Sequence, residues 1–262
     1  MKEIKLAGVP ETMLQTIYAR AKETRTRCAI HDDKAVEVAK QIDYDFSLAD
    51  KDKAMHDGVI ARTIILDRLT SEYLEGNEGA VVVNIAAGLD TRCYRMRGYS
   101  HWYNLDLPDV IDVRARVLPE DGVISQIAAS AMDDWTNLIK EHDVPALVII
   151  EGLTMYLDES DVKRIFEVIS SCFSKVRVFA EIMNPMVVKH FREKSIEGSN
   201  AEFSWGIRDG KALSSLITGF EFKEEHSLTE GMAEIYPVYK LLGRIPMIRG
   251  ISNRIAVLEK GE

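Results

Sequence analysis

The stretch VVVNIAAGLDTRCYR, residues 81–95, decides the fold. A run of β-forming apolar residues enters a turn with a single glycine, Gly88, and leaves it through Asp90, Thr91 and Arg92. That order is typical of the first strand and loop of a nucleotide-binding sheet. A dinucleotide loop, however, needs GxGxxG so that the backbone can approach a pyrophosphate. The stretch therefore predicts an α/β fold and leaves the ligand open.

From residue 81 onward, short apolar runs alternate with helical stretches. Five runs are predicted as strands: Val81–Ala86, His101–Leu105, Val123–Ala128, Ala146–Ile150 and Val176–Ile182. Helices are expected between them, at Pro108–Val117, Asp134–Glu141 and Glu159–Cys172, with Asp158 or Ser160 capping the last. Strands that alternate with helices predict a mostly parallel sheet covered on both faces.

The rest of the chain is expected to frame this core. Residues 1–75 have the apolar spacing of helices and predict an N-terminal helical part. Residues 183–219 contain no strand of their own and are expected to form a helical lid after the fifth strand. Residues 220–262 should add two closing strands, Phe220–Glu225 and Arg254–Leu258. We therefore expect a single domain over 1–262, with residues 81–182 as its ligand-binding core.

Composition sets limits on partners and location. The 262 residues carry a formal net charge of -9, which argues against a general nucleic-acid binder, since such proteins need excess Lys and Arg. The three cysteines form no CxxC pair, and they are expected to be reduced thiols in a protein without a metal site. No signal-peptide core opens the chain, and no apolar run approaches the roughly 20 residues of a membrane span. We therefore expect a cytoplasmic protein with neither a nucleic-acid nor a membrane partner.

Acidic residues stand where the predicted strands end. Asp106 follows the second strand, Asp133 comes after the third, Glu151 follows the fourth, and Glu181 lies near the end of the fifth. Ligands of open α/β sheets bind beyond these carboxyl ends. Asp106 lies 18 residues beyond Gly88, and a carboxylate at about this spacing binds the two hydroxyls of a ribose. The spacing therefore predicts a ribose-containing ligand.

Two ribose-containing cofactors compete for this site. Ala86 stands where a dinucleotide loop has its first glycine, and no second glycine follows Gly88. S-adenosylmethionine (SAM) has no phosphate, and its sulfonium cation suits a ring of carboxylates. The glycine count therefore favours SAM over a nicotinamide dinucleotide, and a dehydrogenase remains the second interpretation.

Longer motifs resemble one family. They are YARAKETR with IDYDF after it, RTIILDR from Arg62, VNIAAGLDTRCYR, WYNLDLPDVIDVR, IIEGLTMYL and FSWGIRD. Together they resemble the leucine carboxyl methyltransferase superfamily, and most closely its bacterial tetracenomycin-type O-methyltransferase branch. The resemblance spans nearly the whole chain. It implies the fold of a class I SAM methyltransferase, a Rossmann-like mostly parallel sheet.

The resemblance also implies roles for matching positions. Arg62 would bind the SAM carboxylate, as a bidentate guanidinium can, and Arg25 is a weaker candidate for the same task. The other cofactor contacts would be Ala86, Gly88 and Asp90 at the methionine part, Asp106 at the ribose, Met132 and Asp133 at the adenine, and Glu151 at the amino end. Tyr156 would stand at the acceptor side as the catalytic residue, and Phe203 and Trp205 of the lid would bind the acceptor.

The implied reaction is methylation of a small-molecule carboxylate, such as a polyketide-like acid, with S-adenosylhomocysteine as the second product. A carboxylate is ionised at neutral pH and needs no general base for in-line attack, whereas a hydroxyl acceptor benefits from one. The family usually has glycine at the position of Ala86, and the extra methyl group is expected to weaken or displace SAM slightly. For that reason a SAM-binding protein without transferase activity remains an alternative.

Overall fold

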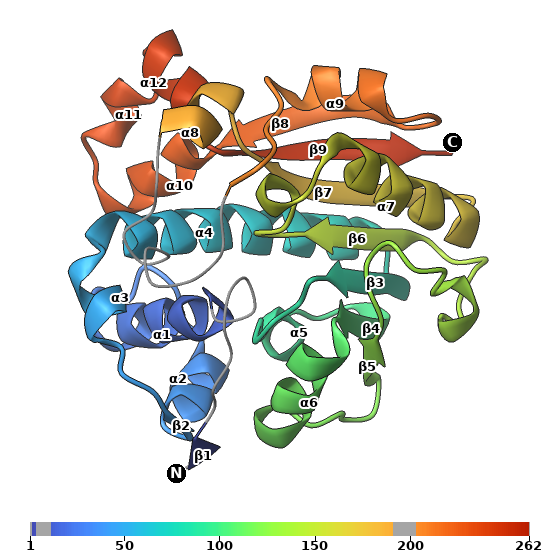
Figure 1. Cartoon of the computed structure of the whole chain (residues 1–262), viewed down its shortest axis with the longest axis horizontal. Coiled ribbons are helices and arrows are strands. Elements are labelled where there is room, and N and C mark those ends of the chain that lie inside the picture. The colour runs from blue at the N-terminus through green and yellow to red at the C-terminus, as the bar shows by residue number, and fades with distance from the viewer. Residues whose placement is uncertain (1, 4–11, 191–202, 262) are drawn as a thin grey trace.

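The fold is given by a computed structural model, which describes residues 2–3, 12–190 and 203–261 (Figure 1). A seven-stranded sheet crosses the molecule in the order β5-β4-β3-β6-β7-β9-β8. Its strands are β3 (Ala80–Ile85), β4 (Tyr99–Asp106), β5 (Ile124–Ala128), β6 (Ala146–Ile150), β7 (Val176–Ile182), β8 (Glu221–Ser227) and β9 (Arg254–Lys260). Strands β3 to β7 pair in parallel, and β9 runs antiparallel to both β7 and β8. The predicted mostly parallel, Rossmann-like sheet is confirmed.

Strands β3 and β6 lie at the centre of the sheet, and apart from Asn84 their residues are apolar on both faces. Every residue of both strands is buried. Val81 and Val83 point to one apolar cluster and Val82 to another on the opposite face. A nearly continuous apolar run rich in Val and Ile is the pattern of a strand that is covered on both sides. The same pattern made these two strands the most predictable part of the chain.

Helices cover both faces of the sheet (Figure 1). The buried side chains of α7 (Glu159–Cys172) and α9 (Gly210–Leu216) join one apolar cluster with the strands. Those of α4 (Lys53–Gly76), α5 (Arg92–Arg95) and α10 (Leu228–Ile235) join the other. Helix α7 begins with a capping box between Asp158 and Asp161, so Asp158 rather than Ser160 is the N-cap.

The N-terminal part is helical, as the sequence predicts. It contains α1 (Thr12–Arg25), α2 (Asp33–Ala39), α3 (Ser47–Lys51) and the long helix α4. A two-stranded parallel sheet of β1 (Lys2–Glu3) and β2 (Ile42–Asp43), which the sequence did not predict, is also present. Apolar side chains of α1 and α2 pack with those of α6 (Pro108–Val117). The N-terminal helices are thereby fixed beside the carboxyl end of the sheet.

The helix predicted over Asp134–Glu141 is wrong, because only the 3-10 turn η2 (Thr136–Leu138) forms there. Asp134 accepts hydrogen bonds from both the backbone N–H and the hydroxyl of Thr136, which favours a turn over a helix. The turn also places Trp135 and Ile139 in the core, where both are buried. A short turn that buries two large apolar side chains replaces the expected helix.

The C-terminal part completes the sheet, and short helices lie between its strands. These are α8 (Pro185–His190) after β7, and α11 (Tyr239–Leu242) and α12 (Pro246–Ile251) between α10 and β9. The predicted closing pair is confirmed as the antiparallel strands β8 and β9. Within the predicted lid at 183–219, α8 and α9 are helical, and residues 191–202 lie outside the described part of the chain.

Candidate functional site

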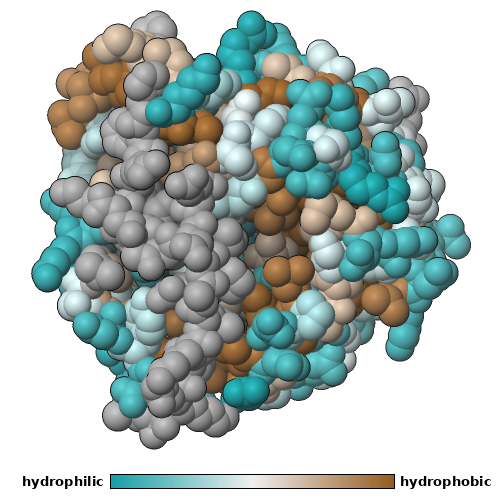
Figure 2. Space-filling view, viewed as in Figure 1, coloured by the Kyte–Doolittle hydropathy of each residue, from teal (hydrophilic) through white to brown (hydrophobic). Residues whose placement is uncertain are grey.

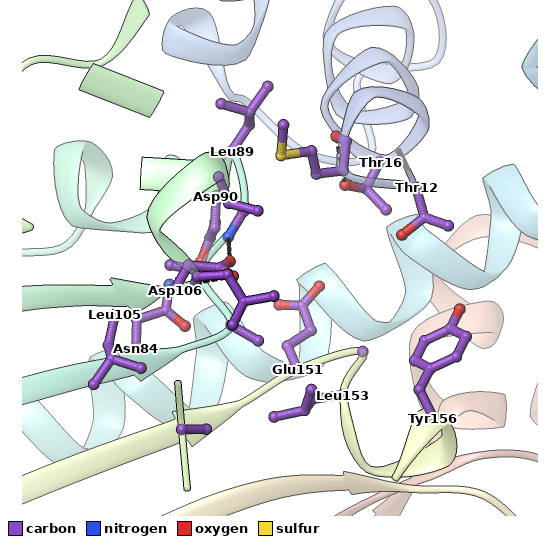
Figure 3. A pocket seen from close by; sticks show the side chains of 18 of the residues that line it. Thr12, Thr16, Asn84, Leu89, Asp90, Leu105, Asp106, Glu151, Leu153 and Tyr156 are labelled. Carbon is purple, nitrogen blue, oxygen red and sulfur yellow. Dashed lines mark hydrogen bonds between the residues drawn. The ribbon is translucent and has the colours of Figure 1, made fainter. Parts of the chain in front are cut away.

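A cavity of about 290 Å³ opens at the carboxyl end of the sheet, between the loops that follow β3 and β6 (Figure 3). From β3 the chain continues to β4 on one side, and from β6 it continues to β7 on the other. This is the point in an α/β sheet where ligands bind. The cavity is also lined by Asp106 after β4, by Met132 after β5, and by Met13 and Thr16 of α1.

The loop after β3 turns through two left-handed residues. Ala86 has φ = 53° and Gly88 has φ = 48°, and both line the cavity. Gly88 has a second reason to be glycine, since a Cβ atom there would lie 3.0 Å from the Cβ of Met13. Ala86 also has a positive φ but carries a side chain. An L-residue with a side chain in this region is strained by roughly 1 kcal/mol or more. The turn therefore holds backbone strain at the edge of the cavity.

We expect Ala86→Gly to stabilise the protein by about 0.5–1 kcal/mol, because glycine removes the left-handed penalty at a smaller entropic cost. For a chain of this size the melting temperature should rise by about 1–4 °C. The measurement is thermal unfolding followed by circular dichroism. Ala87→Gly is the matched control, since Ala87 is buried beside it without a positive φ and should be destabilised. A lower melting temperature in both variants would contradict strain at Ala86.

Asp106 fixes the same loop from the neighbouring strand. One carboxylate oxygen accepts the Gly88 N–H at 2.7 Å, and the other accepts the Leu107 N–H at 2.7 Å. Arg114 adds a hydrogen bond from its guanidinium to the Gly88 carbonyl at 2.9 Å. Burial raises the pKa of Asp106, and the two N–H donors oppose this rise without cancelling it. The carboxylate thus shapes the loop and lines the cavity at once.

Arg92 is the centre of a buried ion network beneath the cavity. It is fully buried and donates to Asp67 at 2.7 Å, to Asp90 at 2.6 Å and to Glu151 at 3.0 Å. Burial raises the pKa of Asp90, but the positive charges of Arg92 and Arg20 outweigh it and hold that pKa well below its usual range. The loops after β3 and β6 are therefore tied together by one guanidinium.

Arg62 of α4 ties the β6 loop to the end of β7. Its guanidinium contacts Glu151 at 2.8 Å and Glu181 at 3.2 Å. Glu181 is fully buried and also accepts the Gly152 N–H at 2.8 Å and the Asn253 side-chain amide at 3.0 Å. Burial raises the pKa of Glu151, but Arg92 and Arg62 together lower it below its usual value. Glu151 is therefore held as a carboxylate.

A second cavity of about 90 Å³ adjoins the first. The two share five lining residues, Thr12, Thr16, Arg62, Gly152 and Tyr156. Much of the remaining wall of the second cavity is apolar, formed by Met55, Val59, Met155, Met183, Phe203 and Leu228. In Figure 3 Glu151 lies between Asp106 and Tyr156, so the shared wall stands on the side away from Asp106.

Most of the residues singled out from the sequence line these cavities. The first cavity collects Arg62, Ala86, Gly88, Asp90, Asp106, Met132, Glu151 and Tyr156, and the second collects Phe203. Phe203 also packs on Tyr156, with ring centroids 5.4 Å apart.

Three singled-out residues lie elsewhere. Arg25 is exposed at the end of α1 and lines neither cavity. Asp133 accepts the Ser130 N–H at 3.0 Å, so it shapes the loop that carries Met132 without lining either cavity. Trp205 is partly buried against the apolar cluster around α7.

Sequence reasoning missed the arginines that organise the site. Arg20 is buried, lines the first cavity and donates to the Leu89 carbonyl at 3.1 Å. Arg92 lies in the LDTR motif, and the sequence alone assigns it no role. The one signal for both was their position within long family motifs, Arg20 in YARAKETR and Arg92 in VNIAAGLDTRCYR.

The described residues show neither a metal-binding cluster nor a membrane-spanning helix. No group of three or more His, Cys, Asp or Glu side chains in them could hold a metal ion. Among the described helices, none combines the length and the apolar character that a membrane crossing requires. The three cysteines are free thiols, as expected, with Cys93 and Cys172 buried and Cys28 exposed.

The chain is similar in sequence to known methyltransferases over nearly its whole length. The chain is 34% identical to the tetracenomycin polyketide synthesis O-methyltransferase TcmP of Streptomyces glaucescens, over 94% of this chain and 95% of that protein. It is 26% identical to the S-adenosyl-L-methionine-dependent methyltransferase dpfgK of Gibberella zeae, over 97% and 91% of the two chains.

Solved structures agree on the fold. The crystal structure of a Thermobifida fusca protein assigned as a methyltransferase superposes with a TM-score of 0.59 at 13% identity, covering 93% of this chain and 94% of that one.

The sequence profile described as leucine carboxyl methyltransferase matches residues 13–170. The chain therefore belongs to the leucine carboxyl methyltransferase family and is a SAM-dependent methyltransferase.

Proposed function

We propose that this enzyme methylates an oxygen atom of a small-molecule acceptor, and that the oxygen belongs to a carboxylate. The observation that carries the proposal is the pair of adjoining cavities. One has a carboxylate at the end of β4 and a glycine turn, and the other has a mixed wall in which apolar side chains, Phe203 among them, stand beside polar ones. Residues 81–182 would then act as the cofactor-binding core, and residues 183–219 would contribute to the acceptor site.

The first cavity fits SAM in its chemistry. The turn in its wall carries the single glycine Gly88, whereas a pyrophosphate needs further glycines so that the backbone can approach it. Asp106 can accept ribose hydroxyls, and Glu151 offers a carboxylate to an amino group. When bound, SAM supplies an electrophilic methyl group on a sulfonium ion.

The remaining contacts follow from the cavity walls. Met132 would border the adenine, the turn at Ala86, Gly88 and Asp90 would surround the methionine part, and Arg62 would meet its carboxylate. The carboxylates of Asp90 and Glu151 keep this end of the cavity negative, which favours a cation there. Tyr156 would face the acceptor from the wall that the two cavities share.

The choice of a carboxylate acceptor rests on the lack of a suitable base. Of the described residues that line either cavity none is a histidine, and both glutamates are paired with Arg62. Of the two aspartates, Asp90 is paired with Arg92 and Asp106 accepts two backbone N–H groups. A carboxylate acceptor is already ionised and needs only alignment with the methyl group and exclusion of water. The relative in Streptomyces glaucescens acts in polyketide synthesis, which supports a polyketide-like acid as the acceptor.

The test is transfer of labelled methyl from SAM into a cell extract, followed by treatment with mild base. A methyl ester should release the label as methanol, whereas an ether or an amine should retain it. Label that stays on the acceptor would contradict a carboxylate acceptor, but it would still be consistent with methyltransferase activity. A lack of S-adenosylhomocysteine binding in calorimetry would contradict the cofactor site itself.

Phe203→Ala should raise the KM for the acceptor about tenfold or more while the KM for SAM stays close to wild type. The reason is that Phe203 lines only the second cavity, where removing a partly buried aromatic side chain forfeits apolar contact of a few kcal/mol at most. Steady-state kinetics with each substrate varied in turn measure both constants.

Trp205→Ala is the matched comparison for this prediction. Trp205 packs against the core and lines neither cavity, so its loss should lower thermal stability more than it changes the acceptor KM. An unchanged acceptor KM in Phe203→Ala would mean that the second cavity does not receive the acceptor.

A further inference from the structure

Exposed apolar side chains gather in one short segment. Nine large apolar residues of the described chain are strongly exposed, and five of them lie within residues 238–251: Val238, Leu241, Ile245, Met247 and Ile251. Met247 is 73% exposed and Leu241 is 67% exposed. Figure 2 shows them as an apolar area over α11 and α12, at the upper left of that view. We call residues 238–251 the C-terminal patch.

The charge of the C-terminal patch is opposite to that of the chain. Lys240, Arg244 and Arg249 are exposed within it, and the sequence has no Asp or Glu between Glu234 and Glu259. The patch therefore carries +3, and because the whole chain carries -9, the remainder carries -12 (-9 minus 3). The ion pairs among described residues include none of these three cations. The surface suits an occupant that is both anionic and apolar.

The shape of the patch favours a flat occupant. Helices α11 and α12 stand at a corner of the molecule, away from the sheet (Figure 1), and none of the patch residues lines either cavity. A partner helix or peptide usually docks into a groove. A protruding set of apolar side chains accompanied by Lys and Arg is instead the arrangement that enters the boundary between headgroups and acyl chains.

A second copy of the chain is a poor occupant. A two-fold interface places the same patch on both subunits, so it would bring two sets of three cations together with no acidic residue from either patch. Like charges at such distances repel. The charge of the patch therefore argues for a partner of another kind.

We propose that the C-terminal patch docks the protein on an anionic lipid surface. Leu241 and Met247 enter the headgroup boundary, and Lys240, Arg244 and Arg249 contact lipid phosphates. The expectation of no membrane partner rested on the lack of a spanning segment, and peripheral docking needs none. The cations contribute attraction of about 1 kcal/mol each near such a surface, which corresponds to about 100-fold in affinity for the three together.

The experiment is flotation of the full chain with vesicles of phosphatidylcholine alone or with about 30% phosphatidylglycerol. Binding should require the anionic lipid and should fall sharply at about 0.5 M salt, because screening weakens the attraction. Leu241→Ser with Met247→Ser should reduce binding at least tenfold. Its matched control is Val123→Ser with Leu138→Ser, two exposed apolar residues outside the patch, which should bind like wild type.

A second pair of variants tests the charge. Arg244→Glu with Arg249→Glu should abolish binding, whereas Lys140→Glu with Lys175→Glu, which reverses two exposed lysines elsewhere, should weaken it much less. Absence of binding to anionic vesicles at low salt would overturn the proposal, as would equal binding by the patch and control variants. A wild-type dimer that Leu241→Ser with Met247→Ser converts to a monomer, without vesicle binding, would assign the patch to self-association instead.

Discussion

Replacing Arg92 with methionine is expected to cost about 3–5 kcal/mol of unfolding free energy. The substitution keeps an unbranched apolar stem but leaves Asp67, Asp90 and Glu151 without the guanidinium that contacts all three. Breaking a buried ion pair from one side is costly because the remaining charges stay buried and uncompensated. Denaturant unfolding at neutral pH measures the loss, which should lower the melting temperature by about 10 °C.

The pH dependence of this loss gives a sharper test. In the wild type the pKa values of Asp67, Asp90 and Glu151 are below their ordinary values, so their stabilisation is complete above about pH 4 and is lost as the pH falls further. Without Arg92, burial favours the protonated forms instead. The difference in unfolding free energy between wild type and Arg92→Met should therefore become smaller as the pH is lowered from 8 toward 5.

Arg208→Met is the control for this prediction. Its side chain is 77% exposed and, within the described part of the chain, pairs with Asp209, so the change should stay within about 0.5 kcal/mol. A loss of similar size in both variants, or a loss in Arg92→Met that does not vary with pH, would mean that the buried network contributes little to stability.

Asp106→Asn is expected to weaken S-adenosylhomocysteine binding about 100-fold or more. The carboxylate accepts backbone N–H groups with both oxygens, and an amide has only one oxygen to offer. Either the Gly88 or the Leu107 N–H then faces an NH₂ group, and the charge that would bind the ribose hydroxyls is lost. Two charged hydrogen bonds at about 1.5 kcal/mol each account for the expected change. Titration calorimetry measures it.

Two controls separate ribose binding from loop structure. Asp109→Asn alters an exposed carboxylate three residues further on, outside the cavity wall, and should bind like wild type. A 2′-deoxyribose form of the ligand should bind more weakly than the normal ligand in the wild type and nearly equally in Asp106→Asn. If the variant still discriminates fully between the two ligands, Asp106 shapes the loop and another group binds the ribose.

The sheet and the cavity loops were predictable because they depend on local patterns. Continuous apolar runs predicted β3 and β6, and the acidic residues after the strands pointed to one edge. The choice between Arg20 and Arg25 was not predictable in this way. Both lie on α1, but the helix ends at Arg25 beyond the packed core, whereas Arg20 is 2% exposed.

The network around Arg62 and Arg92 depends on contacts between distant segments. Arg62 reaches Glu151 across 89 positions and Glu181 across 119, and Asn253 reaches Glu181 across 72. No periodicity within one element specifies such a match, because it is set by how helix α4 lies across the sheet. Local spacing could place each residue at the edge of the sheet, but it could not assign the partners.

The position of β9 has a consequence for how the enzyme is made. This strand leaves the ribosome after every other strand of the sheet, yet it lies between β7 and β8 and pairs with both. Asn253, directly before β9, supplies the amide that Glu181 accepts behind Arg62. A nascent chain that has released β3 to β8 therefore lacks both an interior strand and one support of the site. The order of synthesis delays completion of the candidate site until the fold is nearly finished.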